Sequence, residues 1–178
     1  MTDQLSAKNW LDCGLKALAE HGFTALKAEP LAKAMGVSRG SFYWHFADIE
    51  AFHGELLKLW RDIAAERIIA DVDAASEKDN PMQILLHRVF GEQRALESAV
   101  RRWAAVDPAA RAAVQAIDRR RVSYVEGLLR VAGVADDDAR TRAQILYWTY
   151  LGFALSDRAL PPAQLRAVVQ EMLRIASS

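Results

Sequence analysis

Residues 42–46 read Phe-Tyr-Trp-His-Phe, and these five consecutive aromatic side chains constrain the fold more than any other stretch of the chain. A helix turns about 100° per residue, so Phe42 and Phe46 fall on one face and Trp44 points nearly the opposite way. A hydrophobic core receives side chains from one face of a helix, not from all around it. If Phe42 and Phe46 face the core, Trp44 must face something outside the folded chain.

The aromatic stretch belongs to the second half of a predicted helix-turn-helix. A short helix is expected over residues 28–35, because Pro30 stands in its first turn, where the missing N–H is harmless. Gly36 ends this helix in the left-handed conformation, and Ser38 then caps a helix over residues 39–46. A longer helix precedes both, so the N-terminal part is predicted to be a three-helix unit.

Helical periodicity continues over the rest of the chain. Asp48 caps a helix that is expected to extend to about residue 73, and the polar residues 74–80 form a loop. Further helix boundaries are marked by Asn80-Pro81, Asp107-Pro108, Gly133, Asp136 to Asp138, and Pro161-Pro162. No strand-like alternation is long enough to compete. The chain is therefore predicted to be all-α, with about nine helices.

The charge balance of the whole chain points to no particular partner. The 178 residues contain 23 Lys or Arg and 23 Asp or Glu, so any nucleic-acid site must be local. The single cysteine, Cys13, excludes an intrachain disulfide and fits a reducing compartment. The N-terminus lacks a signal-peptide pattern, and the longest apolar stretch, residues 143–155, is shorter than the ~20 residues that cross a bilayer. We expect a cytoplasmic protein without a membrane segment.

Catalytic, metal and cofactor sites are not predicted. The four histidines show no i,i+4 pair and no cysteine at ligand spacing, which argues against a metal site. We find no nucleophile–base pair and no glycine-rich phosphate loop. Cys13 has only Lys16 beside it to favour the thiolate, so a redox role is not expected. The sequence therefore predicts neither an enzyme nor a cofactor-binding protein.

The predicted outward face of residues 38–46 suits the major groove of DNA, where the second helix of a helix-turn-helix lies with its first residues near the bases. Ser38 and the N–H groups of the first turn suit a phosphate, and Gly40 lets the backbone approach the sugar–phosphate wall. Arg39 offers donors to phosphate or guanine, and Ser41 can hydrogen-bond a base edge.

Three ring-bearing residues complete this candidate DNA site. Tyr43 and His45 offer polar tips to phosphates. Trp44 offers an N–H donor and an apolar surface for a thymine methyl. The alternative is a surface helix that uses the same rings to bind another protein.

Residues 6–60 resemble the N-terminal domain of the tetracycline-repressor (TetR) family of bacterial transcription regulators. The resemblance rests on Leu-Ala-Glu-His-Gly-Phe at 18–23, Leu31-Ala32, and Gly-Val-Ser-Arg-Gly-Ser-Phe-Tyr-Trp-His-Phe at 36–46. It implies that residues 39–45 are the recognition helix and that Tyr43 and His45 touch phosphate. The base readers that it implies are Arg39, Ser41 and Trp44.

Two departures from the family pattern weaken the expected attraction to DNA. Lys27 stands where members often carry Ser or Thr, so a side-chain cap is lost, although the lysine charge can still hold the DNA backbone. Ala47 and Ile49 stand where lysines commonly clamp phosphates. Residues 1–46 carry five Lys or Arg against four Asp or Glu. We therefore predict a shallow salt dependence of DNA binding, because few counterions are released.

The resemblance fades after about residue 60, where family members recognise different small molecules. It implies a homodimer formed by the last two helices of each chain. Two apolar stripes agree with this: Leu165, Val168, Val169 and Met172 on the last helix, and Ile145, Thr149, Gly152 and Phe153 on the preceding one. The alternative is that both stripes cover the core of the monomer.

Aromatic residues of the C-terminal part are candidate contacts for a small-molecule effector, because ligand pockets are mostly apolar with a few polar anchors. Half or more of them are expected to be ordinary core residues. The candidates are Trp60, His87, Trp103, Tyr124, Tyr147 and Trp148. The run Arg119 to Arg121 is interpreted as a solvated, salt-bridged face, since Asp118 and Glu126 lie in the same helix.

These expectations combine into one architecture. Residues 1–47 are predicted to form a three-helix, helix-turn-helix DNA-binding domain, and residues 48–178 a helical ligand-binding and dimerisation domain. The dimer would hold its recognition helices about 34–36 Å apart on double-stranded DNA, at a palindromic operator. We expect a repressor that a small-molecule effector releases. The alternative is an interaction protein that keeps the fold and has weak or lost DNA binding.

Overall fold

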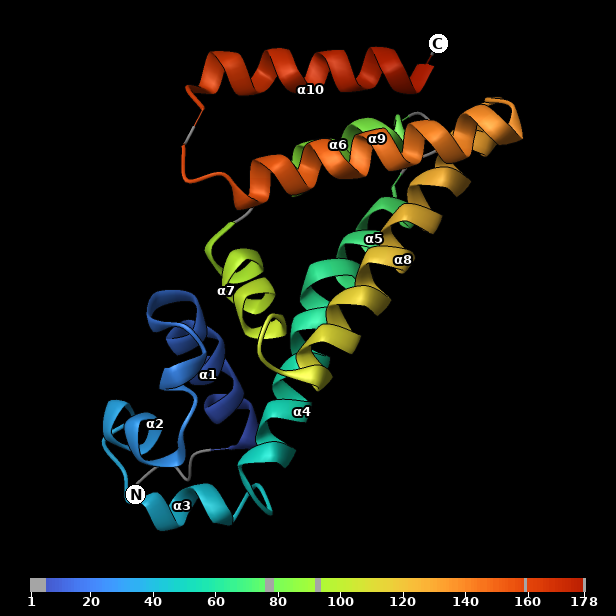
Figure 1. The fold of residues 1–178 in the computed structure, drawn as a ribbon. Helices are drawn as coiled ribbons and strands as arrows, with labels where there is room; N and C mark the ends of the chain where they lie inside the picture. The colour runs from blue at the N-terminus through green and yellow to red at the C-terminus, as the bar shows by residue number, and fades with distance from the viewer. Residues whose placement is uncertain (1–5, 76–78, 92–93, 159, 178) are drawn as a thin grey trace. The chain divides into compact units, whose positions relative to one another are not determined.

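The computed structural model describes residues 6–75, 79–91, 94–158 and 160–177, and all of its regular structure is helical (Figure 1). The helices are α1 (Ala7–His21), α2 (Ala28–Ala34), α3 (Arg39–Tyr43), α4 (Ile49–Arg61), α5 (Arg67–Asp73), α6 (Pro81–Gly91), α7 (Arg94–Ala104), α8 (Pro108–Val131), α9 (Asp136–Leu155) and α10 (Pro162–Ser177). A 3₁₀ turn, η1 (Phe23–Ala25), follows α1, and a π-helical segment, η2 (Asp62–Glu66), joins α4 to α5. With α4, η2 and α5 counted as one run, the described residues form the nine helices that the sequence predicts, and no strand.

The chain divides into two compact units. Unit 1 consists of Met1–Asp62 and Ala95–Gln115, and unit 2 consists of Ile63–Arg94 and Ala116–Ser178. Unit 1 extends beyond the predicted division at residue 47. It includes α4 as well as the three helices of the helix-turn-helix region.

The sequence predicts Ser6 as the N-cap of the first helix, and in unit 1 α1 begins directly after Ser6 and packs closely on α4. The Ser6 side chain accepts a hydrogen bond from the backbone N–H of Asn9, whose own side chain accepts one from the Ser6 N–H, and together these form a capping box. Gly14 lies against Phe52 of α4: a Cβ atom at Gly14 would stand 2.6 Å from the Phe52 Cζ. Glycine is therefore needed at this position for the two helices to approach.

The turn between α2 and α3 has the geometry predicted from Gly36. Gly36 has φ 68°, in the left-handed region, and its N–H donates to the Lys33 carbonyl over 3.2 Å. The Val37 N–H then donates to the Ala32 carbonyl over 3.0 Å. These two bonds form a Schellman ending, which satisfies the last carbonyls of α2 and directs the chain into α3.

The long helix predicted from Asp48 is continuous to residue 73 but contains the π segment η2. Asp48 caps α4, since its carboxylate accepts a 2.7 Å hydrogen bond from the Ala51 N–H. The division between the two units falls at residue 62, where η2 begins. π segments are frequent at functional sites in proteins, and periodicity alone does not reveal them.

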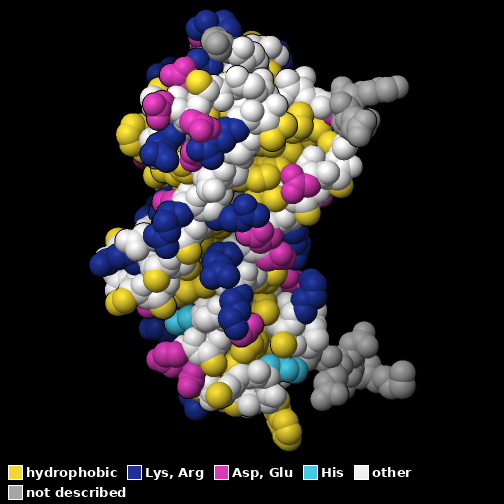
Figure 2. All heavy atoms as spheres, turned by 90° about the vertical axis from the view of Figure 1, so that its right-hand side faces the viewer, with side chains coloured by type: hydrophobic (Ala, Val, Ile, Leu, Met, Phe, Trp, Pro, Cys, Tyr) yellow, Lys and Arg dark blue, Asp and Glu magenta, His cyan; other side chains and the backbone are white. Residues whose placement is uncertain are grey.

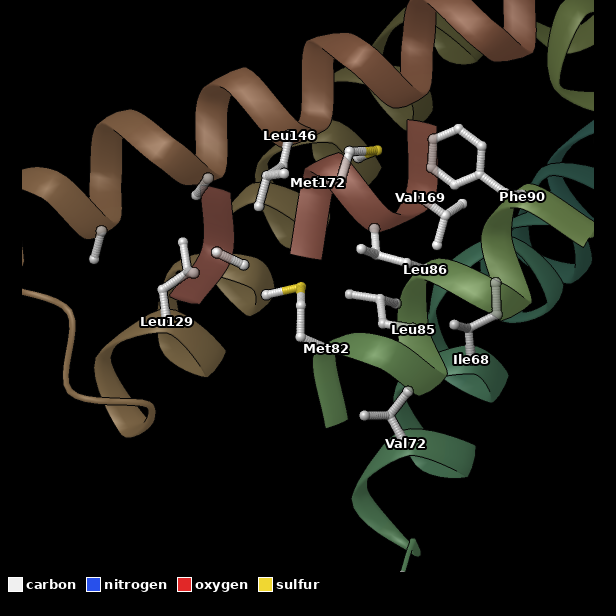
Figure 3. Packing of buried hydrophobic residues seen from close by; sticks show 13 residues of the cluster. Ile68, Val72, Met82, Leu85, Leu86, Phe90, Leu129, Leu146, Val169 and Met172 are labelled. Atoms are coloured by element: carbon white, nitrogen blue, oxygen red, sulfur yellow. The ribbon is translucent and has the colours of Figure 1, made fainter. Parts of the chain in front are cut away.

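Unit 2 is a bundle around one apolar core, to which α5, α6, α8, α9 and α10 each contribute side chains (Figure 3). Figure 3 shows Met82, Leu85 and Leu86 of α6 facing Leu146 of α9 and Met172 of α10. α8 ends in a Schellman turn at Gly133, where the sequence predicts a helix boundary: the Val134 N–H donates to the Leu129 carbonyl over 3.0 Å.

Two predicted helix ends need correction. Helical periodicity predicts that α3 ends at Phe46 and α9 at about Ala159, whereas α3 ends at Tyr43 and α9 at Leu155. Ala159 itself lies outside the described residues. The predicted apolar stripe of α10 packs against the core of unit 2: Val169 and Met172 are each 3% exposed, and Leu165 and Val168 are half-buried.

Candidate functional site

The aromatic side chains of α3 and the turn after it divide between the core and solvent as the sequence predicts. Phe42 is fully buried, and its ring centroid lies 5.3 Å from those of Trp10 and Phe52. Phe46 is 6% exposed and also packs on Phe52. Trp44, by contrast, is 88% exposed. Figure 2 shows a hydrophobic side chain projecting from the end of unit 1 where Figure 1 places α3.

The polar candidates for DNA contact lie on the same outward side. We call this set the α3 surface: Ser38, Arg39, Gly40, Ser41, Tyr43, Trp44 and His45, all exposed or half-buried. The Arg39 guanidinium carbon stands 5.9 Å from the centroid of the Tyr43 ring, one helical turn away. This cation–π contact orients the arginine along the surface and leaves both groups accessible.

Two positions of the α3 surface are not explained by the packing of the monomer. A Cβ atom at Gly40 would meet nothing nearer than the Ser38 Oγ at 3.7 Å, so the chain itself does not require glycine there. Ser38 is the N-cap of α3, with extended backbone at φ −73° and ψ 149°, but its side chain makes no capping hydrogen bond. A close external backbone or phosphate would account for both residues.

Lys27 occupies the cap position of α2 and is exposed. Its backbone is extended, with φ −128° and ψ 147°, as expected of an N-cap residue, and it provides no side-chain cap. The loss of this cap, predicted from the sequence, is confirmed. On α1, Lys8 is paired with Asp12 at 2.5 Å.

An aromatic cluster in unit 1 contains one of the predicted effector contacts, Trp103. Its indole stacks on Phe23 with ring centroids 4.9 Å apart and planes 15° apart. The His53 ring lies 5.3 Å from Trp103, and His53 Nε2 is 3.0 Å from the Leu26 carbonyl oxygen. Trp60 is likewise buried in unit 1, at 1% exposure. Neither Trp60 nor Trp103 lines the cavity described below.

Unit 2 contains a partly open cavity of about 60 Å³, which we call the unit 2 cavity. Two of the predicted effector contacts, Tyr124 and Tyr147, belong to its lining. The complete lining is Ala64, Ala65, Ile68, Ile69, Met82, Leu85, Leu86, Val89, Arg121, Tyr124, Val125, Leu146, Tyr147, Tyr150 and Met172. His87 and Trp148 line two separate, open depressions of the surface instead.

Three of the four polar side chains of the cavity lining, Arg121, Tyr124 and Tyr147, are hydrogen-bonded within unit 2. The Tyr147 hydroxyl donates to an Asp118 carboxylate oxygen over 2.5 Å, and the Tyr124 hydroxyl to Asp73 over 2.6 Å. Burial, followed by the hydrogen bond to Asp73, raises the pKa of Tyr124 well above its ordinary value. The phenol of Tyr124 is therefore uncharged over the physiological pH range.

Arg121 is a lining residue that the sequence pattern did not single out. Its Nε and Nη2 atoms donate to the Ala64 carbonyl over 3.3 and 3.0 Å, within the π segment. The Arg119 to Arg121 run was expected to be a solvated face, and for Arg121 this is wrong. Tyr150, whose ring lies 5.2 Å from the Arg121 guanidinium carbon, was also missed, although its i+3 spacing from Tyr147 could have suggested it.

Other candidate chemistry adds no site within the part of the chain that the structure describes. Burial raises the pKa of the half-buried Cys13 thiol, which opposes thiolate formation. No group of three or more His, Cys, Asp or Glu side chains among the described residues is arranged to hold a metal ion. None of the helices described has the length and apolar character to span a membrane.

Comparison with known proteins supports the resemblance of the N-terminal region to the TetR family. Residues 11–56 match the family described as bacterial regulatory proteins, tetR family. The HTH-type transcriptional regulator AcrR of Shigella flexneri is 34% identical over 56 residues. These are 32% of this chain and 26% of AcrR, so the match spans about a quarter of that relative's length.

Solved structures with little sequence identity share the whole fold. A protein from Rhodococcus sp. described as a TetR-family transcriptional regulator superposes with a TM-score of 0.79 at 18% identity, covering 97% of this chain and 98% of its own. A protein from Saccharomonospora viridis is described as a transcriptional regulator in complex with choline. It superposes with a TM-score of 0.73 at 16% identity, covering 94% of this chain and 95% of its own. At these identities the likeness establishes the fold alone.

Proposed function

We propose that this protein is a transcriptional regulator that binds double-stranded operator DNA through the α3 surface. The match of residues 11–56 to the tetR family of bacterial regulatory proteins supports this proposal. One observation carries the proposal. Trp44 is 88% exposed on a segment whose Phe42 is fully buried. An exposed indole adds little to the stability of the monomer, but in a major groove it supplies an N–H donor and an apolar surface.

Each residue of the α3 surface has a proposed role that follows from its chemistry. Arg39, Ser41 and Trp44 read base edges. Tyr43, His45 and Ser38 hold phosphates, and Gly40 admits the sugar–phosphate backbone. Lys27, at the start of α2, adds a phosphate contact through its charge.

The proposed protein is a homodimer formed through the last two helices of each chain, with a helical face of α9 at the interface. Ile145, Trp148 and Leu155 are 43%, 64% and 45% exposed and recur at three- and seven-residue spacing on one face of the helix. Gly152 lies in the same stripe, with open space where a Cβ atom would stand. A two-fold dimer presents two recognition helices, which is why a palindromic operator is expected.

The proposed mode of action is repression that a small molecule relieves. The unit 2 cavity is the proposed effector site, and the choline complex of the Saccharomonospora protein is an example of a small molecule bound by a protein of this fold. A ligand that favours one conformation by about 1–3 kcal/mol changes operator affinity by about 5- to 150-fold. Such a regulator acts on chromosomal DNA, so a cytoplasmic location is proposed. The family consists of regulatory proteins, and no catalytic role is proposed.

The test begins by recovering the DNA that the full chain retains from random sequence and measuring its affinity by fluorescence anisotropy. Trp44→Ala and Arg39→Ala should each weaken specific binding by about 1–3 kcal/mol. Val106→Ala is the matched control, because Val106 is an apolar residue of unit 1 with 73% exposure outside the α3 surface. Wild-type affinity in both α3 variants would reject the assignment of α3 as the recognition helix.

The interaction-protein alternative is favoured by one observation, the weak charge of the N-terminal region. Ala47 and Ile49 supply no positive charge, and Lys8 is neutralised by Asp12. If the chain retains no DNA sequence above background at low salt, this alternative replaces the proposal.

A further inference from the structure

We infer that the unit 2 cavity takes an uncharged, predominantly apolar molecule and that Met82 and Met172 make room for it. The inference rests on the proposed effector role of the cavity and names the chemical class of the effector. Three properties of the lining carry it: its carbon-rich walls, the internal pairing of its polar groups, and its small volume at rest.

The walls of the cavity are built mostly from side chains that cannot solvate a charge. Apart from Arg121 and three tyrosines, every residue of the lining is aliphatic or a methionine, and the lining contains no Asp, Glu or Lys. A charged ligand would lose its hydration free energy on entry, and apolar walls of low dielectric constant would replace little of it. An apolar ligand gains from the same transfer.

Three of the four polar side chains at the cavity, Arg121, Tyr124 and Tyr147, already have hydrogen-bond partners in unit 2. Tyr124 and Tyr147 donate their hydroxyl protons to Asp73 and Asp118, so both phenols present ring faces rather than free donors. Arg121 donates twice to the Ala64 carbonyl. Its positive charge disfavours a cation such as a quaternary ammonium, even though aromatic rings alone would attract one.

The volume of the cavity requires that side chains move when a ligand enters. About 60 Å³ is less than the ~150 Å³ of an apolar cavity that holds benzene. Met82 of α6 and Met172 of α10 both line the space, and Figure 3 shows both in the core between these helices. Methionine has three rotatable bonds and no branch, so it can change rotamer more easily than the leucines beside it. The ligand must therefore fit the cavity together with the space that two such side chains release.

The test compares probes that differ only in charge, using the full chain. N-phenyl-1-naphthylamine is uncharged and fluoresces when shielded from water, and 8-anilinonaphthalene-1-sulfonate is its anionic counterpart. Choline and 3,3-dimethyl-1-butanol form a second pair, in which carbon replaces the quaternary nitrogen. We expect the uncharged naphthylamine to bind more tightly than the sulfonate. The alcohol should displace it at a concentration at least about tenfold below that of choline, since only choline must be desolvated as an ion.

Two variants locate the probe. Ala65→Leu fills the cavity and should weaken naphthylamine binding at least about tenfold, whereas Ala70→Leu, at an exposed alanine of the same helical run, should leave it unchanged. If circular dichroism shows that Ala65→Leu does not fold, the Met82→Ala variant tests instead whether the probe binds in the cavity. This variant enlarges the cavity and must tighten binding or admit a larger probe.

Several outcomes would overturn the inference. Tighter binding of the sulfonate, with loss in Arg121→Gln, would assign an anionic ligand. Stronger displacement by choline than by its carbon analogue would assign a cation. Unchanged probe binding in a folded Ala65→Leu variant, or no binding to either the wild type or Met82→Ala, would exclude the cavity. Operator binding is measured on the same preparations, so loss of DNA binding with intact probe binding contradicts only the proposed function.

Discussion

The α3 surface and the unit 2 cavity both contain several ring-bearing side chains. They differ in whether these side chains are buried and hydrogen-bonded within the chain. In the cavity, Tyr124 and Tyr147 have carboxylate partners at 2.6 and 2.5 Å. On α3, Trp44 is 88% exposed and the Ser38 side chain makes no capping bond. Satisfied polar groups and apolar walls suit a small apolar ligand, whereas exposed rings and an uncapped helix start suit a polar macromolecule.

The largest expected difference is between two neighbouring aromatic residues of the α3 segment. Phe42→Ala should lower the free energy of unfolding by about 3–5 kcal/mol, because it leaves a cavity among Trp10 and Phe52. Trp44→Ala should change it by less than about 0.5 kcal/mol, because the ring is exposed. Urea denaturation followed by circular dichroism measures both. A comparable loss in the two variants would show that Trp44 belongs to the folding core.

The next largest effect on stability is expected at Gly14, which helix packing requires. Gly40, which packing does not require, serves as the comparison. Gly14→Ala should lower the free energy of unfolding by about 1–3 kcal/mol, since its Cβ would stand 2.6 Å from the Phe52 ring. Gly40→Ala should leave stability within about 1 kcal/mol, because its Cβ has an ordinary 3.7 Å contact, but should weaken operator binding. Thermal unfolding and anisotropy on both variants check this. Unchanged operator affinity in Gly40→Ala would remove its proposed backbone role.

A smaller effect is expected at the edge of the unit 2 cavity, and it depends on pH. Tyr124→Phe removes the hydrogen bond to Asp73 and should lower the free energy of unfolding by about 0.5–1.5 kcal/mol at pH 7. The pKa of Tyr124 is raised in the folded state, so its contribution is full below the unfolded pKa of about 10 and is lost as pH rises further. Stability should therefore fall less steeply above pH 10 in the variant.

The control for Tyr124 comes from the α3 surface. Tyr43→Phe, at a tyrosine that is 51% exposed, should change the free energy of unfolding by less than about 0.5 kcal/mol at pH 7. Urea unfolding at pH 7 and pH 10.5 compares the two variants with the wild type. An equal alkaline loss in the wild type and in Tyr124→Phe would contradict the role assigned to the Asp73 bond.

The smallest expected effect is that of salt on operator binding. Residues 1–46 carry five Lys or Arg against four Asp or Glu, and Lys8 is paired with Asp12. Few phosphates are neutralised, so the slope of log affinity against log salt should be much shallower than about −8. Ala47→Lys with Ile49→Lys should steepen it by up to about two units. A wild-type slope of −8 or beyond would contradict the weak charge of the α3 surface.

The helix-turn-helix was predictable because its signals are local. Ser6, Gly36 and Asp48 act within a few residues of their positions, and the structure confirms each cap or stop. The burial of Phe42 and Phe46 followed from helical spacing in the same way. The π segment η2 was not predictable, because it changes the hydrogen-bond ladder without breaking the apolar pattern.

The cavity shows where local reasoning fails. Aromatic residues were candidates for the effector site by type alone, yet Trp60 and Trp103 lie in the core of unit 1. Arg121, Met82 and Met172 line the cavity although neither a charge run nor a core stripe distinguishes a lining residue from its neighbours. Helical periodicity assigns a residue to a face, but it does not say which other helix meets that face.

The sequence by itself determined the helices, the turn after α2, and the outward direction of Trp44, because these depend on hydrogen bonds and side-chain spacing within one or two helical turns. Only the tertiary structure decided that the α10 stripe packs against the core of unit 2, that α9 keeps an exposed apolar face, and that fifteen residues from six segments line one cavity. Those outcomes depend on how distant helices pack around a shared core, and such contacts are not encoded in the period of any single helix.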